Sequence, residues 1–139
     1  MDIRLYETSD ITKAVCQLVE KLYGQGKRIQ IICQNQLMVV SLDQALWQFK
    51  QLSFLPHMTD LDNADPMTQL IFITSNLADN LNQAEVIISC NTTPQKADCI
   101  NLIGICDTEF CPQFIALYPP QQHFIQMQGE AWQAAACAP

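Results

Sequence analysis

Residues 3–33 have the sequence IRLYETSDITKAVCQLVEKLYGQGKRIQIIC and decide the fold that we expect for this chain. They begin with a short apolar segment that suits a strand, and the Ser-Asp pair at residues 9–10 then offers a helix N-cap. Between residues 11 and 23 the apolar side chains are spaced three and four apart, as on one face of a helix. The Gly-Gln-Gly segment at residues 24–26 ends this helix, and the apolar run at residues 28–33 suits a buried strand. Two strands joined through a helix by tight connections predict a parallel βαβ unit.

The rest of the chain extends this pattern to an α/β fold. A second helix is expected over about residues 36–48, and its apolar side chains available for packing are Leu37, Val40, Leu42, Ala45 and Leu46. Further apolar runs predict strands at residues 70–74, 85–90 and 100–106. Strands this apolar are usually buried on both faces. We therefore expect a Rossmann-like, three-layer α/β/α sandwich with a mainly parallel five-stranded sheet.

The segments outside these elements are less regular. Residues 50–69 contain two prolines and four Asp or Asn residues, and they have turn and loop character. Prolines at 112, 119 and 120 interrupt any long helix, so we expect only short helices near residues 113–118 and 121–128. The chain is expected to form one domain over residues 1–139, with residues 131–139 as a frayed tail.

Composition and charge narrow the classes of function. Hydrophobic residues make up 49% of the 139 residues and charged residues 15%, which argues against disorder. We see no secretory signal and no apolar run long enough to cross a membrane, so we expect a cytoplasmic location and no membrane partner. The net charge is −7, and from residue 51 onward Lys96 is the sole basic residue among nine acids. Such a surface repels phosphate, so direct binding to nucleic acid is not expected.

The sequence suggests no metal, cofactor or catalytic site. The seven cysteines include no Cys-x-x-Cys pair, and we interpret them as reduced structural thiols. His57 and His123 are far apart along the chain and neither forms a recognisable motif with a cysteine, which makes a zinc site or a catalytic thiol improbable. The glycines at residues 24–26 follow a helix, whereas a phosphate-binding loop precedes one. The first strand is also not followed by the glycines of a dinucleotide site.

One group of residues points to a protein partner. Residues 42–47, LDQALW, place Trp47 at the end of the second predicted helix, and FLPH follows at residues 54–57. Large apolar side chains in a helix end and a loop resemble the aromatic clusters of protein–protein interfaces. The alternative is that Trp47 and Phe54 only cover the edge of the sheet. The predicted partner-binding residues are Trp47, Phe54, Leu55, Pro56 and His57.

These segments resemble the chi subunit family of bacterial DNA polymerase III. The sequences GKR at residues 26–28, LDQALW at 42–47 and FLPH at 54–57 occur in the order and at the approximate spacing of that family. The likeness covers about residues 1–90. It implies a non-catalytic clamp-loader subunit that pairs with the psi subunit and binds the acidic C-terminal tail of single-stranded DNA-binding protein. It also implies that the Trp47 and Phe54 surface contacts psi, or a repair helicase that competes for it in some bacteria.

The last third departs from the family pattern. Family members usually present a basic, aromatic C-terminal helix to the acidic tail, but this chain has no Lys or Arg after Lys96. The corresponding residues 109–118 are apolar and interrupted by proline. An acidic peptide draws its strongest hydrogen bonds from cations, so tail binding is expected to be weak or absent. Two alternatives stay open: a chi-like adaptor for a repair helicase that has lost the tail site, and an unrelated small α/β enzyme.

Overall fold

The computed structural model of the protein describes residues 1–48, 58–59, 70–75, 83–95, 99–126 and 132–134. Within these ranges the elements run in the order β1 (Asp2–Thr8), α1 (Ile11–Gly24), β2 (Ile29–Cys33), α2 (Gln36–Gln48), β3 (Met58–Thr59), β4 (Ile71–Thr74), β5 (Val86–Cys90), β6 (Asn101–Cys106), α3 (Cys111–Leu117), β7 (Gln122–Gln126) and β8 (Gln133–Ala134). None of these helices is long and apolar enough to span a membrane.

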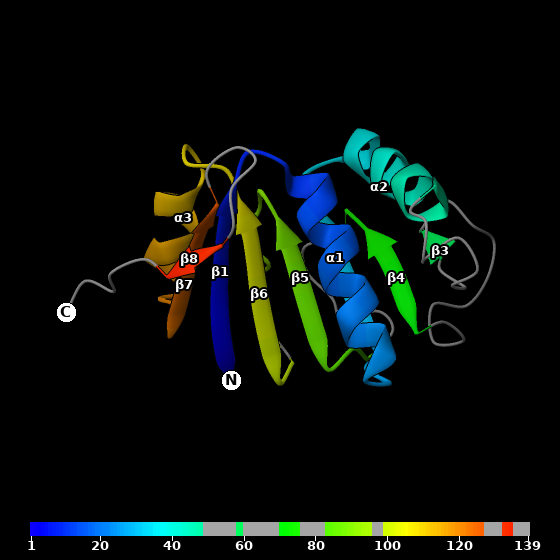
Figure 1. The fold of residues 1–139 in the computed structure, drawn as a ribbon, viewed down its shortest axis with the longest axis horizontal. Coiled ribbons are helices and arrows are strands. Elements are labelled where there is room, and N and C mark those ends of the chain that lie inside the picture. The colour runs from blue at the N-terminus through cyan, green and yellow to red at the C-terminus, as the bar shows by residue number, and fades with distance from the viewer. Residues whose placement is uncertain (49–57, 60–69, 76–82, 96–98, 127–131, 135–139) are drawn as a thin grey trace.

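The strands form one twisted sheet in the order β3-β4-β2-β5-β6-β1-β7-β8 (Figure 1). Every neighbouring pair is parallel except β7 and β8. The α1 crossover therefore carries the chain from β1 past β6 and β5 to β2. This arrangement confirms the predicted α/β class and the mainly parallel sheet.

The first helix begins and ends where its sequence predicts. The Asp10 side chain accepts a hydrogen bond from the backbone N–H of Lys13 at 3.2 Å and so caps α1. At the other end Gly26 has φ +73°, and the next N–H, from Lys27, reaches back to the carbonyl of Leu22 at 3.3 Å. Glycine adopts this left-handed conformation without steric cost. The glycine segment therefore ends a helix.

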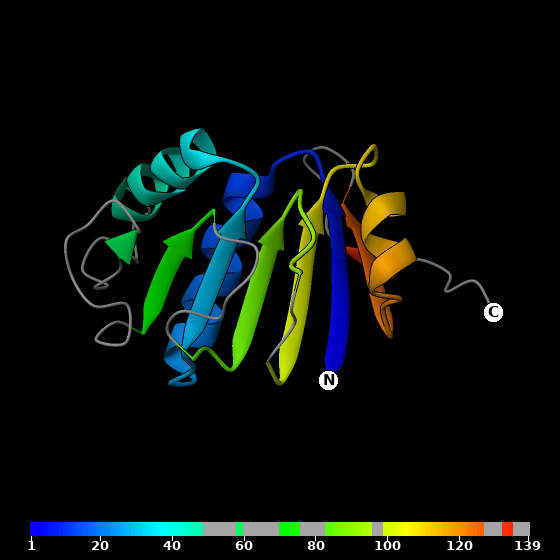
Figure 2. The ribbon, with the colours of Figure 1, turned by 180° about the vertical axis from the view of Figure 1, so that it is seen from behind.

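The two faces of the sheet are covered by different helices (Figures 1 and 2). Helices α1 and α2 pack on one face, over alternate residues of β2, β4, β5 and β6. Helix α3 packs on the opposite face, over β1 and β6. Phe114 of α3 lies so close to Gly104 that a Cβ there would come within 2.6 Å of the aromatic ring. The contact requires glycine, because a methyl group cannot fit at that distance.

The structure corrects two predictions for the sheet. Residues 122–126 form β7 and pair with β1 rather than forming a helix. Glutamine-rich segments have good helix propensity. However, β1 pairs with β6 on one side only, and the backbone N–H and C=O groups on its other side need hydrogen-bond partners. Pairing with β7 supplies these partners and outweighs the helix propensity. Among the described residues the sheet also has eight strands rather than five, because β7 and the two-residue strands β3 and β8 join the five that were predicted. Pro112 lies in the first turn of α3, where a missing N–H is tolerated.

Candidate protein-binding surface

Helix α2 has apolar side chains on both of its faces. Val39, Leu42 and Leu46 point inward and are buried in the core. On the outward face Leu37 is 77% exposed, Val40 37% and Trp47 48%. These three positions, spaced three and seven apart, follow one side of a helix. We call Leu37, Val40 and Trp47 the α2 stripe.

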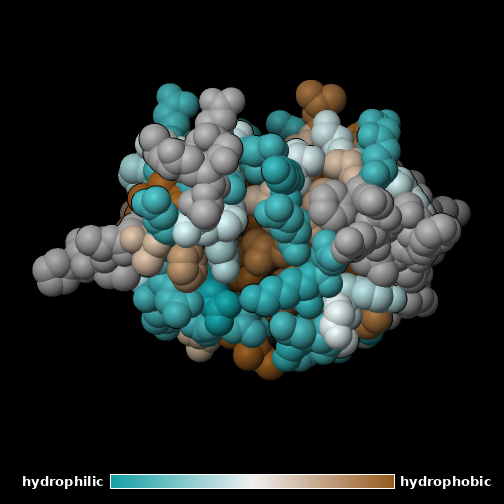
Figure 3. All heavy atoms as spheres, viewed as in Figure 1, coloured by the Kyte–Doolittle hydropathy of each residue, from teal (hydrophilic) through white to brown (hydrophobic). Residues whose placement is uncertain are grey.

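The α2 stripe is unusual when compared with α1. The strongly exposed side chains of α1 are all polar: Thr12, Lys13, Gln17 and Lys21. Helix α2 contains a single charged residue, Asp43. An apolar side of a helix is normally buried, whereas the side of α2 that carries Leu37, Val40 and Trp47 is exposed. Much of the surface seen in Figure 3 is hydrophilic, with apolar residues in small separate areas.

Hydrogen bonds at its start hold α2 in place. The Asn35 side chain accepts from the backbone N–H of Met38 at 2.9 Å, as an N-cap does. The Gln36 side-chain amide donates to the Ser75 hydroxyl at 2.8 Å, which ties the helix to the residue after β4. The stripe is therefore presented by a helix whose position is set by its cap and by its buried face.

The predicted partner-binding residues are only partly described by the structure. Trp47 lies in the last turn of α2 and is half exposed. Phe54, Leu55, Pro56 and His57 lie outside the described residues. Leu37 and Val40 were expected to pack inward, and the structure shows instead that they belong to the exposed stripe. Their spacing from Trp47 was the signal that could have revealed this.

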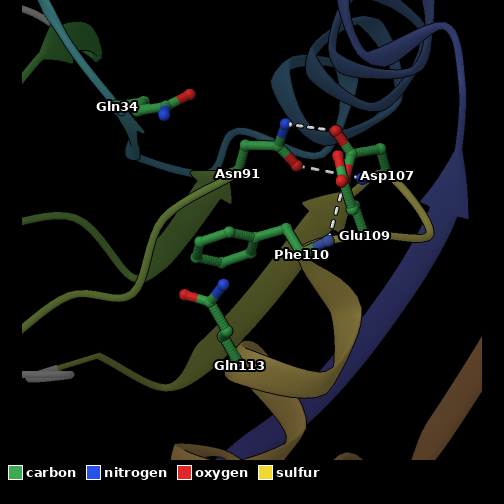
Figure 4. A pocket seen from close by; sticks show the side chains of 6 residues that line it. All are labelled: Gln34, Asn91, Asp107, Glu109, Phe110 and Gln113. Carbon is green, nitrogen blue, oxygen red and sulfur yellow. Dashed lines mark hydrogen bonds between the residues drawn. The ribbon is translucent and has the colours of Figure 1, made fainter.

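A pocket of about 340 Å³ lies at the carboxyl ends of the central strands (Figure 4). Its lining side chains are Gln34, Asn91, Asp107, Glu109, Phe110 and Gln113. Asp107 accepts hydrogen bonds from the Asn91 side-chain amide at 2.9 Å and from the Phe110 backbone N–H at 2.8 Å. Within the part of the chain that the structure describes, no basic side chain lines this pocket. Its two carboxylates make it unsuited to phosphate or to an acidic peptide.

A third group lies beneath α3. His123 Nε2 is 3.2 Å from Glu7 Oε1, and the Cys111 thiol lies beside them. His123 forms no recognisable sequence motif with a cysteine, but the pairing of β7 with β1 brings it to this position. A hydrogen bond with Cys106, burial and the negative charge of Glu7 raise the pKa of the Cys111 thiol. A thiol with a raised pKa stays protonated, so Cys111 is not an activated nucleophile.

Comparison with known proteins shows a similarity to a family of DNA polymerase subunits. The sequence profile of the family described as "DNA polymerase III chi subunit, HolC" matches residues 2–110 and ends just before α3. One curated relative, the DNA polymerase III subunit chi of Escherichia coli (strain K12), is 35% identical over 49 residues. That alignment covers 35% of this chain and 33% of the relative, about a third of each protein.

Proposed function

We propose, because this chain belongs to the DNA polymerase III chi subunit family, that it acts as a non-catalytic accessory subunit of the bacterial replicative polymerase. Its main partner in this proposal is the psi subunit, which would hold it in the clamp loader. The role places the protein in the cytoplasm, where the chromosome is replicated. The observation that carries the proposal is the α2 stripe, which lies within the residues matched by the family profile.

The stripe has the chemistry of a binding surface. Leu37 and Trp47 expose a large part of their side chains to water, and burying an apolar side chain of this size contributes about 1.5–3 kcal/mol. Tryptophan is also the residue most enriched at sites that dominate binding energy. An apolar segment of psi that covers the stripe would remove this surface from water, and the rigid helix would lose little conformational entropy on binding.

The loop residues complete the proposed interface. Phe54, Leu55 and Pro56 follow α2 after five intervening residues, and we assign them to the same psi-binding surface as Trp47. His57 has a less direct role, either pinning the loop through a backbone hydrogen bond or touching the partner. A repair helicase that binds the same surface would compete with psi.

The proposed link to single-stranded DNA-binding protein is weak in this chain. Asp107 and Glu109 add negative charge near the start of α3, and the sequence supplies no Lys or Arg after Lys96. An acidic tail would meet repulsion there rather than charge-assisted hydrogen bonds. A chi-like adaptor that serves psi or a helicase without the tail site is therefore the second candidate function.

Calorimetric titration with psi from the same organism tests the main proposal. The wild-type protein should bind psi tightly with one-to-one stoichiometry, and Phe54→Ala should weaken binding at least about tenfold without changing the circular dichroism spectrum. Absence of binding by the folded wild-type protein would reject psi as the partner. Equal binding by the wild type and Phe54→Ala would remove the loop from the interface.

A further inference from the structure

Two polar side chains point into the layer between the sheet and α3. Strand pairing sets His123 of β7 opposite Leu5 of β1, so the imidazole lies on the face where Leu5 packs. Glu7 is two residues further along β1 and therefore points to the same face. Glu7 and His123 each keep only 16% of their side-chain surface exposed. A carboxylate and an imidazole thus lie at the margin of an apolar core cluster.

The thiol of Cys111 lies beside the Glu7 carboxylate and the His123 imidazole. Cys111, the first residue of α3, is 4% exposed and belongs to that core cluster. One oxygen of Glu7, one nitrogen of His123 and the sulfur of Cys111 all lie within 4.8 Å of one another. We propose that Glu7, Cys111 and His123 form a zinc-binding site that leaves one coordination position for water or another ligand.

The geometry fits zinc after a small adjustment. Tetrahedral zinc with bonds of about 2.0–2.3 Å sets its ligand atoms about 3.4–3.6 Å apart. The His123 to Glu7 distance of 3.2 Å is close to this value. Since no two of the three ligand atoms are more than 4.8 Å apart, the group requires a closure of at most about 1 Å, which side-chain torsions can supply.

The donor set and its surroundings favour zinc over other ions. A thiolate and an imidazole suit zinc, whereas magnesium and calcium prefer oxygen ligands alone. With a thiolate, a carboxylate and a neutral imidazole, bound zinc carries no net charge, which lowers the cost of partial burial. The Thr108 hydroxyl donates to the other oxygen of Glu7 at 3.0 Å and so orients the carboxylate.

Two of the three proposed zinc ligands lie in the C-terminal part of this chain. Cys111 and His123 both follow residue 110, where the match to the family profile ends. Zinc would connect β1, α3 and β7, and it would hold the C-terminal strand against the sheet. The site is independent of the proposed psi interface, because α3 and α2 lie on opposite faces of the sheet.

Zinc content measured by mass spectrometry tests the proposal. The full chain, stripped with a chelator, incubated with zinc chloride and passed through gel filtration, should retain about one zinc ion per chain. Cys111→Ser and His123→Ala should each lose that zinc, whereas Cys99→Ser, which removes a thiol outside the group, should keep it. Retention of zinc by both site variants, or less than about 0.2 zinc per wild-type chain, would overturn the proposal.

Cobalt substitution gives a second readout that needs no folded variant. A cobalt ion bound by Cys111 should produce a thiolate charge-transfer absorption band together with the visible bands of tetrahedral geometry. The milder variant Glu7→Gln keeps the shape of the side chain and should weaken zinc binding at least about tenfold. A wild-type cobalt spectrum without the thiolate band would reject Cys111 as a ligand.

Discussion

Replacing Trp47 by alanine tests the α2 stripe most directly. Trp47 is 48% exposed, and a tryptophan side chain can bury up to about 250 Å², so about 120 Å² remains for a partner to cover. At about 25 cal/mol per Å² this area corresponds to about 3 kcal/mol. Reorganisation at the interface reduces the gain, so we expect Trp47→Ala to weaken psi binding by about 2 kcal/mol, or about thirtyfold.

The matched control is Leu117→Ala. Leu117 is 64% exposed at the end of α3, on the opposite side of the sheet from α2. Its loss should change psi affinity by less than about twofold, because exposed apolar residues outside an interface contribute little to binding. Both variants should be titrated calorimetrically after circular dichroism shows that they are folded. A Trp47→Ala affinity within about threefold of wild type, or equal weakening by both variants, would refute the assignment of the stripe.

The remaining predictions concern packing, thiol reactivity and the acidic tail. Gly104→Ala should lower the free energy of unfolding by about 1–3 kcal/mol in urea denaturation, because the new methyl group meets the Phe114 ring; an unchanged midpoint would contradict this contact. Burial, with the charge of Asp10 as a smaller cause, raises the pKa of Cys16 to about 11, so the thiol stays protonated up to that pH. At pH 8 the native protein should therefore be alkylated at the half-buried Cys99 before Cys16, as followed by peptide mass spectrometry, and the reverse order would contradict the burial of Cys16. Fluorescence anisotropy should show weak or no binding of a labelled single-stranded DNA-binding protein tail at physiological salt, since the chain has no Lys or Arg after Lys96. A dissociation constant in the low micromolar range would show that the tail uses another surface.

Most of the sheet could be predicted because its local signals agree with its tertiary environment. The apolar runs at β2, β4, β5 and β6 lie in the sheet interior, where both faces are covered and hydrophobicity alone marks a strand. Helix α2 has the predicted bounds, residues 36–48. The C-terminal strand β7 was missed because its sequence QHFIQ has neither a continuous apolar run nor a strict alternation of polar and apolar residues, and it contains helix-forming glutamines. Its strand conformation depends on the free edge of β1, which lies more than a hundred residues away in the sequence.

The residues of the candidate sites also differ in how far the sequence could predict them. Trp47 could be singled out from its type and position, whereas Leu37 and Val40 could have been placed on the exposed side only from their helical spacing relative to Trp47. Apolar residues on two sides of a helix do not by themselves show which side faces the core, because periodicity identifies a face only when the other face is polar. The group beneath α3 was invisible for a different reason: Glu7 and His123 are 116 residues apart and become neighbours only through the pairing of β1 with β7.

The sequence by itself determined the βαβ start, the helix at residues 36–48, the run of buried strands and the family to which these segments belong. These features depend on interactions between residues close in the chain, such as the Asp10 cap and the left-handed Gly26, or on continuous apolar runs. Only the tertiary structure decided which side of α2 faces solvent, where β7 pairs and how Glu7, Cys111 and His123 meet. Those outcomes follow from the order of strands in the sheet, which is set by packing between distant segments rather than by local sequence.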